Sequence, residues 1–113
     1  MFQFLSRRAE AQDVAAAELR RAVRARLPGA MEILATRFGV ARVVLFGSHA
    51  RGSADDNSDI DLLVWGLDPL RQFAAIAELE RWFGGPAVDL VRVEDVRGPV
   101  GARALAEGEV LLG

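Results

Sequence analysis

The first third of the chain has hydrophobic positions with the period of an α-helix. Between residues 8 and 27, apolar residues recur every four positions and arginines lie off that stripe. We therefore predict a helix over residues 8–27, which Pro28 and Gly29 end. A second, short helical pattern covers residues 30–38, and Gly39 ends it as a left-handed helix stop.

The rest of the chain alternates between strand-like and helix-like patterns. Short β-branched or alternating apolar runs predict strands, bounded by glycine, proline and small polar residues. Longer segments with helical spacing predict helices. The predicted strands are 42–46, 59–65, 87–93 and 110–112. The predicted helices are 69–83 and 99–107, and residues 47–51 are expected to form a turn that opens a short helix.

This order of elements indicates an α/β (α+β) fold, with a small mixed β-sheet and helices packed on one face. A chain of 113 residues, half of them apolar, suits a single compact domain. We interpret residues 1–113 as one domain, in which residues 1–28 form an N-terminal helical extension.

Composition excludes several kinds of site and partner. The chain has no cysteine and one histidine, so any metal must be held by carboxylates, which favour Mg²⁺ or Mn²⁺. A net charge of −2 makes a poor surface for long nucleic acid. No apolar run is long enough to span a membrane, and no signal-like segment is found. We therefore expect a cytoplasmic protein.

The candidate chemistry begins where the first predicted strand ends. Gly47 and Ser48 precede a helix start, where backbone N–H groups are free and attract anions. Gly47 has no Cβ, so a phosphate can approach the main chain, and the Ser48 hydroxyl can donate to it. Arg51 either contacts the phosphate or pairs with Asp55 or Asp56.

Three aspartates form the second part of the candidate site. Asp59 and Asp61 are two residues apart on a predicted strand, so their carboxylates share one face, about 6.6 Å apart along the chain. Asp89 lies on the next predicted strand and can share that face. Three such carboxylates repel one another strongly unless they hold cations, as they do in two-metal sites. The alternative for an isolated Asp-x-Asp is an ordinary turn followed by a solvent-facing strand.

Together these motifs resemble the signature of the DNA polymerase β-like nucleotidyltransferase superfamily: Gly-Ser, ten intervening residues, then Asp-x-Asp. The segments GSHARG and SDIDLLV are similar to those of its minimal nucleotidyltransferase (MNT) branch, and so are VDLV and ALAEGEVLL further on. The resemblance implies that Gly47 and Ser48 hold a triphosphate and that Asp59, Asp61 and Asp89 hold two Mg²⁺ ions. It also implies that Asp89 helps to deprotonate the acceptor hydroxyl.

The resemblance further implies a partner. Many MNT proteins of this size act as antitoxins of HEPN-family ribonuclease toxins, and their best characterised mechanism is transfer of AMP from ATP to a toxin tyrosine. Two alternatives stay open. One is a small-molecule (aminoglycoside-type) nucleotidyltransferase, which the lack of a second domain disfavours. The other is a non-catalytic binding module that neutralises the toxin by occlusion, which the intact aspartates disfavour.

The remaining polar and aromatic candidates are interpreted as structural. His49 is given no catalytic role. Trp65 and Trp82 could stack on a base, but they fit better as core or interface aromatics. A solvated helix face is the interpretation for four arginines, with a partner-binding surface as the alternative: Arg20, Arg21, Arg24 and Arg26.

Overall fold

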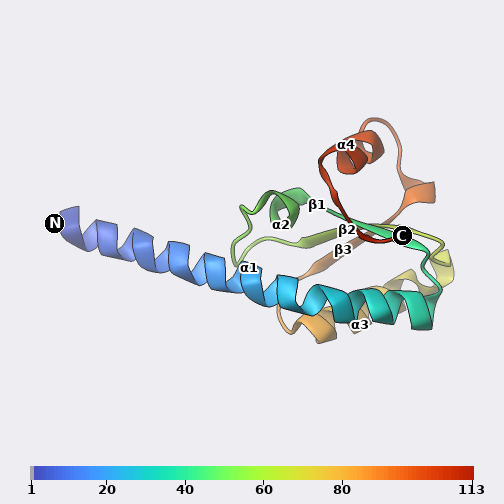
Figure 1. Cartoon of the computed structure of the whole chain (residues 1–113), viewed down its shortest axis with the longest axis horizontal. Coiled ribbons are helices and arrows are strands. Elements are labelled where there is room, and N and C mark those ends of the chain that lie inside the picture. The colour runs from blue at the N-terminus through green and yellow to red at the C-terminus, as the bar shows by residue number, and fades with distance from the viewer. Residues whose placement is uncertain (1) are drawn as a thin grey trace.

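The computed structural model describes residues 2–113, with side chains described for residues 11–99 and 101–113. Over this range helices and strands alternate strictly along the chain (Figure 1). The helices are α1 (Phe2–Phe38), α2 (Gly47–Arg51), α3 (Gln72–Phe83) and α4 (Val100–Glu107). The strands are β1 (Arg42–Phe46), β2 (Ile60–Trp65), β3 (Val88–Arg92) and β4 (Glu109–Leu112). Short 3₁₀ turns lie at Pro69–Arg71 and Val93–Asp95.

The strands form one mixed sheet in the order β3-β2-β1-β4. β1 pairs antiparallel with both β2 and β4, whereas β2 and β3 run parallel. A parallel pair needs a crossover connection, which α3 supplies. The predicted mixed sheet is therefore confirmed, and the starts of β2 and β3 lie at the same edge as the end of β1.

The main core lies between the sheet and the layer formed by α1 and α3. Ile60, Leu62 and Val64 of β2 are fully buried there, together with Leu34 of α1 and Leu79 of α3. Helices thus cover this face of the sheet, as the sequence predicts. No helix within residues 2–113 is both long enough and apolar enough to cross a lipid bilayer.

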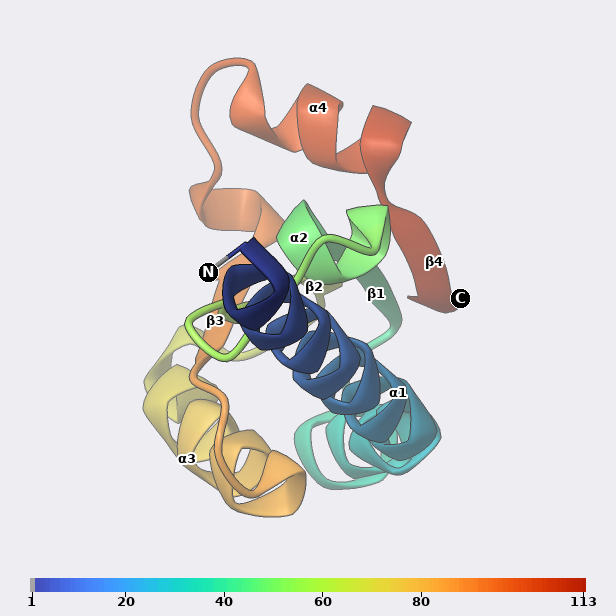
Figure 2. The ribbon, with the colours of Figure 1, turned by 90° about the vertical axis from the view of Figure 1, so that its left-hand side faces the viewer.

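The opposite face of the sheet carries a second, smaller core. Val44 and Leu63 are buried there beneath Ala104 of α4, which lies on the far side of the sheet from α1 and α3 (Figure 2). The sequence pattern did not predict this additional cover. Because α4 is short, it leaves exposed side chains on the same face, among them Asp59 and Asp89.

The prediction that Pro28 and Gly29 end a helix is wrong. α1 is one helix of 37 residues that runs through Pro28. Proline inside a helix costs about 3 kcal/mol, and burial of its neighbours Leu27 and Ala30 in the main core offsets that cost. Gly29 allows close packing, because a Cβ at this position would overlap the ring of Trp82. Gly39, with φ +67°, does end the helix as predicted.

Three of the four arginines of α1 attach the helix to the rest of the molecule. Arg24 and Arg26 are nevertheless exposed, as the interpretation of a solvated face requires, and Arg20 is partly buried. Arg20 Nη1 donates to the Ala54 carbonyl at 2.7 Å. Arg24 donates to Glu109 Oε2 at 2.7 Å and to the His49 carbonyl at 3.3 Å. These bonds hold the segment that follows the Gly-Ser turn, from His49 to Ala54, and the start of β4.

Arg26 makes the third attachment, to the end of α3. Arg26 Nη1 donates to the Trp82 carbonyl at 3.2 Å, and Trp82 Nε1 donates to the Arg26 carbonyl at 2.8 Å. Trp82 therefore has a structural role. Trp65 packs against the smaller core, and the guanidinium of Arg42 lies 4.9 Å from its ring centroid.

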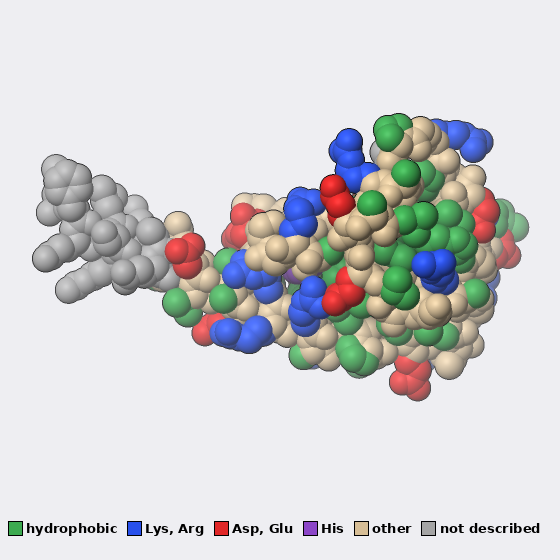
Figure 3. All heavy atoms as spheres, turned by 45° about the horizontal axis from the view of Figure 1, so that its top comes forward, with side chains coloured by type: hydrophobic (Ala, Val, Ile, Leu, Met, Phe, Trp, Pro, Cys, Tyr) green, Lys and Arg blue, Asp and Glu red, His purple; other side chains and the backbone are tan. Residues whose placement is uncertain are grey.

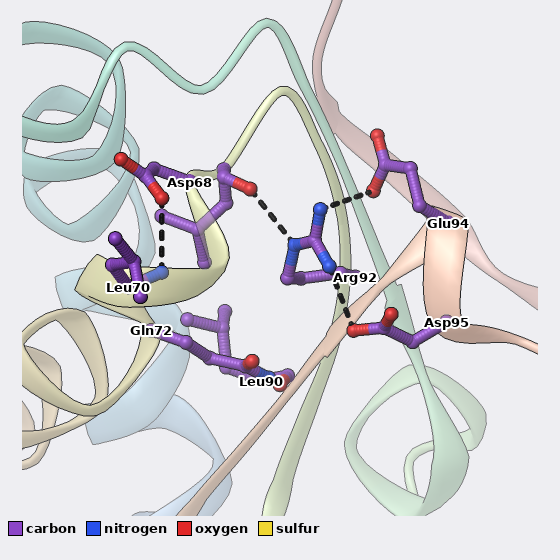
Figure 4. A network of polar contacts seen from close by, with 8 residues as sticks. Asp68, Leu70, Gln72, Leu90, Arg92, Glu94 and Asp95 are labelled. Carbon is purple, nitrogen blue, oxygen red and sulfur yellow. Dashed lines mark hydrogen bonds and ion pairs between the residues drawn. The ribbon is translucent and has the colours of Figure 1, made fainter.

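A polar network fixes the crossover at the other end of β2 and β3 (Figure 4). Arg92 Nε donates to the Leu67 carbonyl at 2.8 Å, and its Nη1 lies 2.9 Å from Asp95 Oδ2. Gln72 Nε2 donates to the Leu90 carbonyl at 2.8 Å, and the Asp68 carboxylate accepts from the Leu70 N–H. The polar groups at this end bond to one another, whereas the end that carries Asp59 and Asp89 is exposed.

The continuity of α1 can be tested at Pro28. Pro28→Ala should raise the free energy of unfolding by about 1 to 3 kcal/mol, because a helical alanine restores the N–H donor and removes the ring clash. Urea denaturation measures the change. Pro86→Ala is the control: it lies in the loop before β3, where replacing proline brings no such gain. A neutral or destabilising Pro28→Ala would contradict a continuous helix.

Candidate active site

The register of β2 and β3 places two of the candidate carboxylates side by side. Asp61 pairs with Asp89 across the parallel strands, and Asp61 also faces Phe46 of β1. Neighbouring residues in register are about 4.8 Å apart and project from the same face. Asp59 lies one residue before β2 and two positions from Asp61, so strand alternation directs it to that face as well.

The three carboxylates differ in exposure and influence one another. Asp61 is half-buried, whereas Asp59 and Asp89 are exposed. Burial raises the pKa of the Asp61 carboxyl to about 6, and the negative charges of Asp89 and Asp59 add to the effect, while Arg51 opposes it. Among the three, Asp61 is therefore the carboxyl whose ionisation the folded state disfavours most when no cation is bound.

The donor set fits Mg²⁺, although the ligands are not preassembled. Among the residues with described side chains, no three acidic or histidine groups converge as a ready metal cluster. Mg²⁺ characteristically uses one or two carboxylates, retains waters and takes its remaining ligands from substrate phosphates. Exposed and half-buried carboxylates on one sheet face suit a metal of that kind. A cation would offset both the burial and the carboxylate repulsion that raise the pKa of Asp61.

Gly47 lies directly against the Asp61 carboxylate. Its backbone has φ +73°, in the left-handed region, and a Cβ here would overlap Asp61 Oδ2. Glycine is therefore needed for the turn and for the approach of Asp61, a reason that the sequence did not reveal. Ser48 follows at the start of α2 and is half-buried, and its carbonyl accepts from the Ser53 N–H at 2.9 Å.

Arg51 lies on the site side of α2. Within the described side chains it forms no ion pair with Asp55 or Asp56. Asp55 instead accepts from the Asn57 N–H and the Ser58 hydroxyl within its own turn. The guanidinium acts electrostatically on Asp61. The expected alternative, pairing with Asp55 or Asp56, is therefore not found among the described side chains.

The His49 side chain is buried beneath α2 and does not lie on the sheet face with the aspartates. Only 2% of its surface is exposed, and Nε2 has no hydrogen-bond partner among the described residues. Burial lowers the pKa of its imidazole, and Arg24 and Arg20 lower it further. His49 is therefore a neutral, buried side chain, consistent with giving it no catalytic role.

Sequence reasoning missed the contribution of α4 to this region. A pocket of about 150 Å³ beside Gly47 and Arg51 is also lined by Arg103 and Glu107. No spacing along the chain links these residues to the Gly-Ser turn. Only the packing of α4 on the smaller core brings them there.

The fold and the sheet face together are those of a nucleotidyltransferase. The family profile described as "Nucleotidyltransferase domain" matches residues 27–108. The chain belongs to this family, which confirms the resemblance to polymerase β-like minimal nucleotidyltransferases.

Individual relatives agree with this placement. Protein adenylyltransferase MntA of Thermococcus cleftensis is 34% identical over 77 residues, which cover 66% of this chain and 77% of the relative. A solved structure of a minimal nucleotidyltransferase is 33% identical, with a TM-score of 0.70 over 80% of this chain and 93% of that one. The complex of a tri-AMPylated Shewanella oneidensis HEPN toxin with its MNT antitoxin shares the fold, at 20% identity and a TM-score of 0.64 over 80% of this chain and 71% of that one.

The folded state disfavours the ionised Asp61 carboxylate, so this charge should lower the free energy of unfolding of the metal-free protein. The carboxyl has a pKa of 3.8 in the unfolded chain and about 6 in the folded one. Well below pH 3.8 it is protonated in both states and costs nothing. As the pH rises toward 6 the unfolded chain ionises first, so stability is lost, and above about pH 6 the loss is complete. Asp61→Asn should therefore raise the free energy of unfolding at pH 7.5 by about 1 to 2 kcal/mol, after allowance for solvent screening.

Urea denaturation in EDTA at pH 4 and pH 7.5 measures this effect. The gain from Asp61→Asn should be present at pH 7.5 and small at pH 4. Asp56→Asn is the matched control, since Asp56 is exposed in a turn away from the sheet face. Equal effects of the two substitutions at pH 7.5 would show that Asp61 carries no special electrostatic cost.

Proposed function

We propose that the chain transfers the AMP group of ATP to a hydroxyl of a HEPN-family ribonuclease toxin and thereby acts as its antitoxin. The observation that carries the proposal is the in-register pair of Asp61 and Asp89 beside Gly47, with Asp59 on the same face. Membership of the nucleotidyltransferase family supports the reaction class. The relatives support the acceptor, because one is a protein adenylyltransferase and another is bound to an AMPylated HEPN toxin.

Each feature of the turn and the sheet face has a role in this proposal. Gly47 and Ser48 hold the triphosphate through backbone N–H groups and the Ser48 hydroxyl, and Arg51 contributes a charge-assisted hydrogen bond. Asp59, Asp61 and Asp89 would hold two Mg²⁺ ions. Bound there, the ions would supply Lewis-acid neutralisation of the charge on the attacking and leaving oxygens.

The reaction is an in-line displacement at the α-phosphorus of ATP. The acceptor oxygen forms a bond to that phosphorus, and the bond to the β-phosphate oxygen breaks, so pyrophosphate leaves. Asp89 is exposed at the strand edge, where it can accept the proton of the acceptor hydroxyl. Asp61, packed against Gly47, is held in one position by the main chain. A reaction that consumes ATP accords with the cytoplasmic location expected from the sequence.

Two other functions make different demands on the same face. A module that neutralises the toxin by occlusion would not need charged side chains at Asp59, Asp61 and Asp89, which raise the electrostatic cost of the metal-free fold. A small-molecule nucleotidyltransferase would need a pocket for its acceptor beside the carboxylates. The pocket that adjoins Gly47 measures only about 150 Å³, below the size typical of small-molecule sites.

The double variant Asp59→Asn/Asp61→Asn separates catalysis from occlusion. It removes the charge that holds Mg²⁺ while preserving side-chain shape, so the protein should fold yet lose protection against the toxin. Growth of cells that co-express the variant with the toxin measures protection, and circular dichroism verifies the fold. The double variant Asp13→Asn/Asp56→Asn makes the same charge change away from the sheet face and should protect like the wild type. Full protection by a folded Asp59→Asn/Asp61→Asn protein would favour occlusion.

A further inference from the structure

The pocket beside Gly47 has two walls from distant parts of the chain. β1 and α2 contribute one wall and α4 the other. The lining residues are Phe46, Gly47, Arg51, Arg103, Ala104 and Glu107. Since Gly47 also touches Asp61, the pocket adjoins the carboxylate face directly.

The position of the α4 wall is fixed by tight packing. Ala104 is buried against Val44 and Leu63, where a small side chain lets the helix approach the sheet closely. Gly108 closes the turn into β4, because a Cβ there would overlap the Ala104 carbonyl and Val44. Arg103, adjacent to the buried Ala104, is therefore held at the edge of the pocket by the fold itself.

Three of the residues that line the pocket are charged: Arg51, Arg103 and Glu107. Arg51 and Arg103 are both exposed, and within the described side chains neither takes part in an ion pair. Glu107 lies one helical turn after Arg103, where it can orient the guanidinium, but the two arginines outnumber it. Figure 3, which turns the α4 side toward the viewer, shows basic and acidic side chains interspersed on this face. Two unpaired guanidinium groups around one small cavity favour an anionic ligand with several oxygens.

We propose that Arg103 is a second arginine contact to the β- and γ-phosphates of the nucleotide, supplied by α4 from outside the Gly-Ser and Asp-x-Asp motifs. The inference rests on the proposed function and specifies how its nucleotide is held. The α-phosphate must lie at the carboxylates, because the reaction takes place there. The rest of the phosphate chain then extends past Gly47 into a cavity too small for a whole nucleotide. Arg51 and Arg103 bind it from opposite walls.

Calorimetric titration of the full chain with ATP and with AMP, both in Mg²⁺, tests this contact. Arg103→Ala should weaken ATP binding by roughly 10- to 100-fold, the loss expected for a charge-assisted contact. AMP, which lacks the β- and γ-phosphates, should bind with less than about a threefold change. Arg103→Lys keeps the charge without the paired donors and should recover part of the affinity. Arg81→Ala is the matched control, an exposed helical arginine on α3, and should bind both nucleotides like the wild type.

Two results would overturn the inference while leaving the proposed function intact. In one, Arg103→Ala binds ATP as tightly as the wild type. In the other, it loses ATP and AMP affinity equally, which places Arg103 near the nucleoside or gives it a structural role. Conversely, Arg103-dependent ATP binding by a protein that transfers no AMP would sustain the inference and refute the proposed function. Circular dichroism of each variant ensures that only folded protein is compared.

Discussion

Mutual repulsion between carboxylates on neighbouring parallel strands is the constraint on which the rest of the site depends. Asp61 and Asp89 are paired by the register of β2 and β3, and burial of Ile60 and Leu62 on the other face fixes that register. A slip of one residue would expose those side chains and bury the aspartates. The main core thus sets the positions of the charged groups. Partial burial, and then the negative charges of Asp89 and Asp59, raise the pKa of Asp61.

The surrounding structure holds this unfavourable arrangement in place. Gly47 gives the Asp61 carboxylate room against the main chain, and no other residue fits there without displacing it. Arg24 and Arg20 of α1 bind the carbonyls of His49 and Ala54, so the segment from the Gly-Ser turn to the acidic turn is anchored on both sides. The N-terminal helix therefore supports the candidate site as well as the core.

Local pattern was sufficient to predict the strands, the mixed sheet and the segment with the candidate residues, because alternation and glycine turns are short-range signals. It failed at Pro28, where burial of Leu27 and Ala30 in the main core outweighs the local cost of a proline in a helix. It also gave no sign of the hydrogen bonds that the arginines of α1 make, whose partners are 25 to 85 residues away in the chain. Arg103 was missed for the same reason, since only the packing of α4 places it beside Gly47.

The most direct test of the account is the fate of α-labelled ATP mixed with the full chain and its partner toxin. The account predicts label on the toxin in Mg²⁺, and none in EDTA or with Asp59→Asn/Asp61→Asn, because the carboxylates act only through a bound cation. Separation of the same reaction mixtures into protein and small molecules shows whether a small molecule takes up the label instead. Absence of label from the toxin in Mg²⁺, with folded wild-type protein and protected cells, would contradict the claim that this sheet face transfers a nucleotidyl group to the partner.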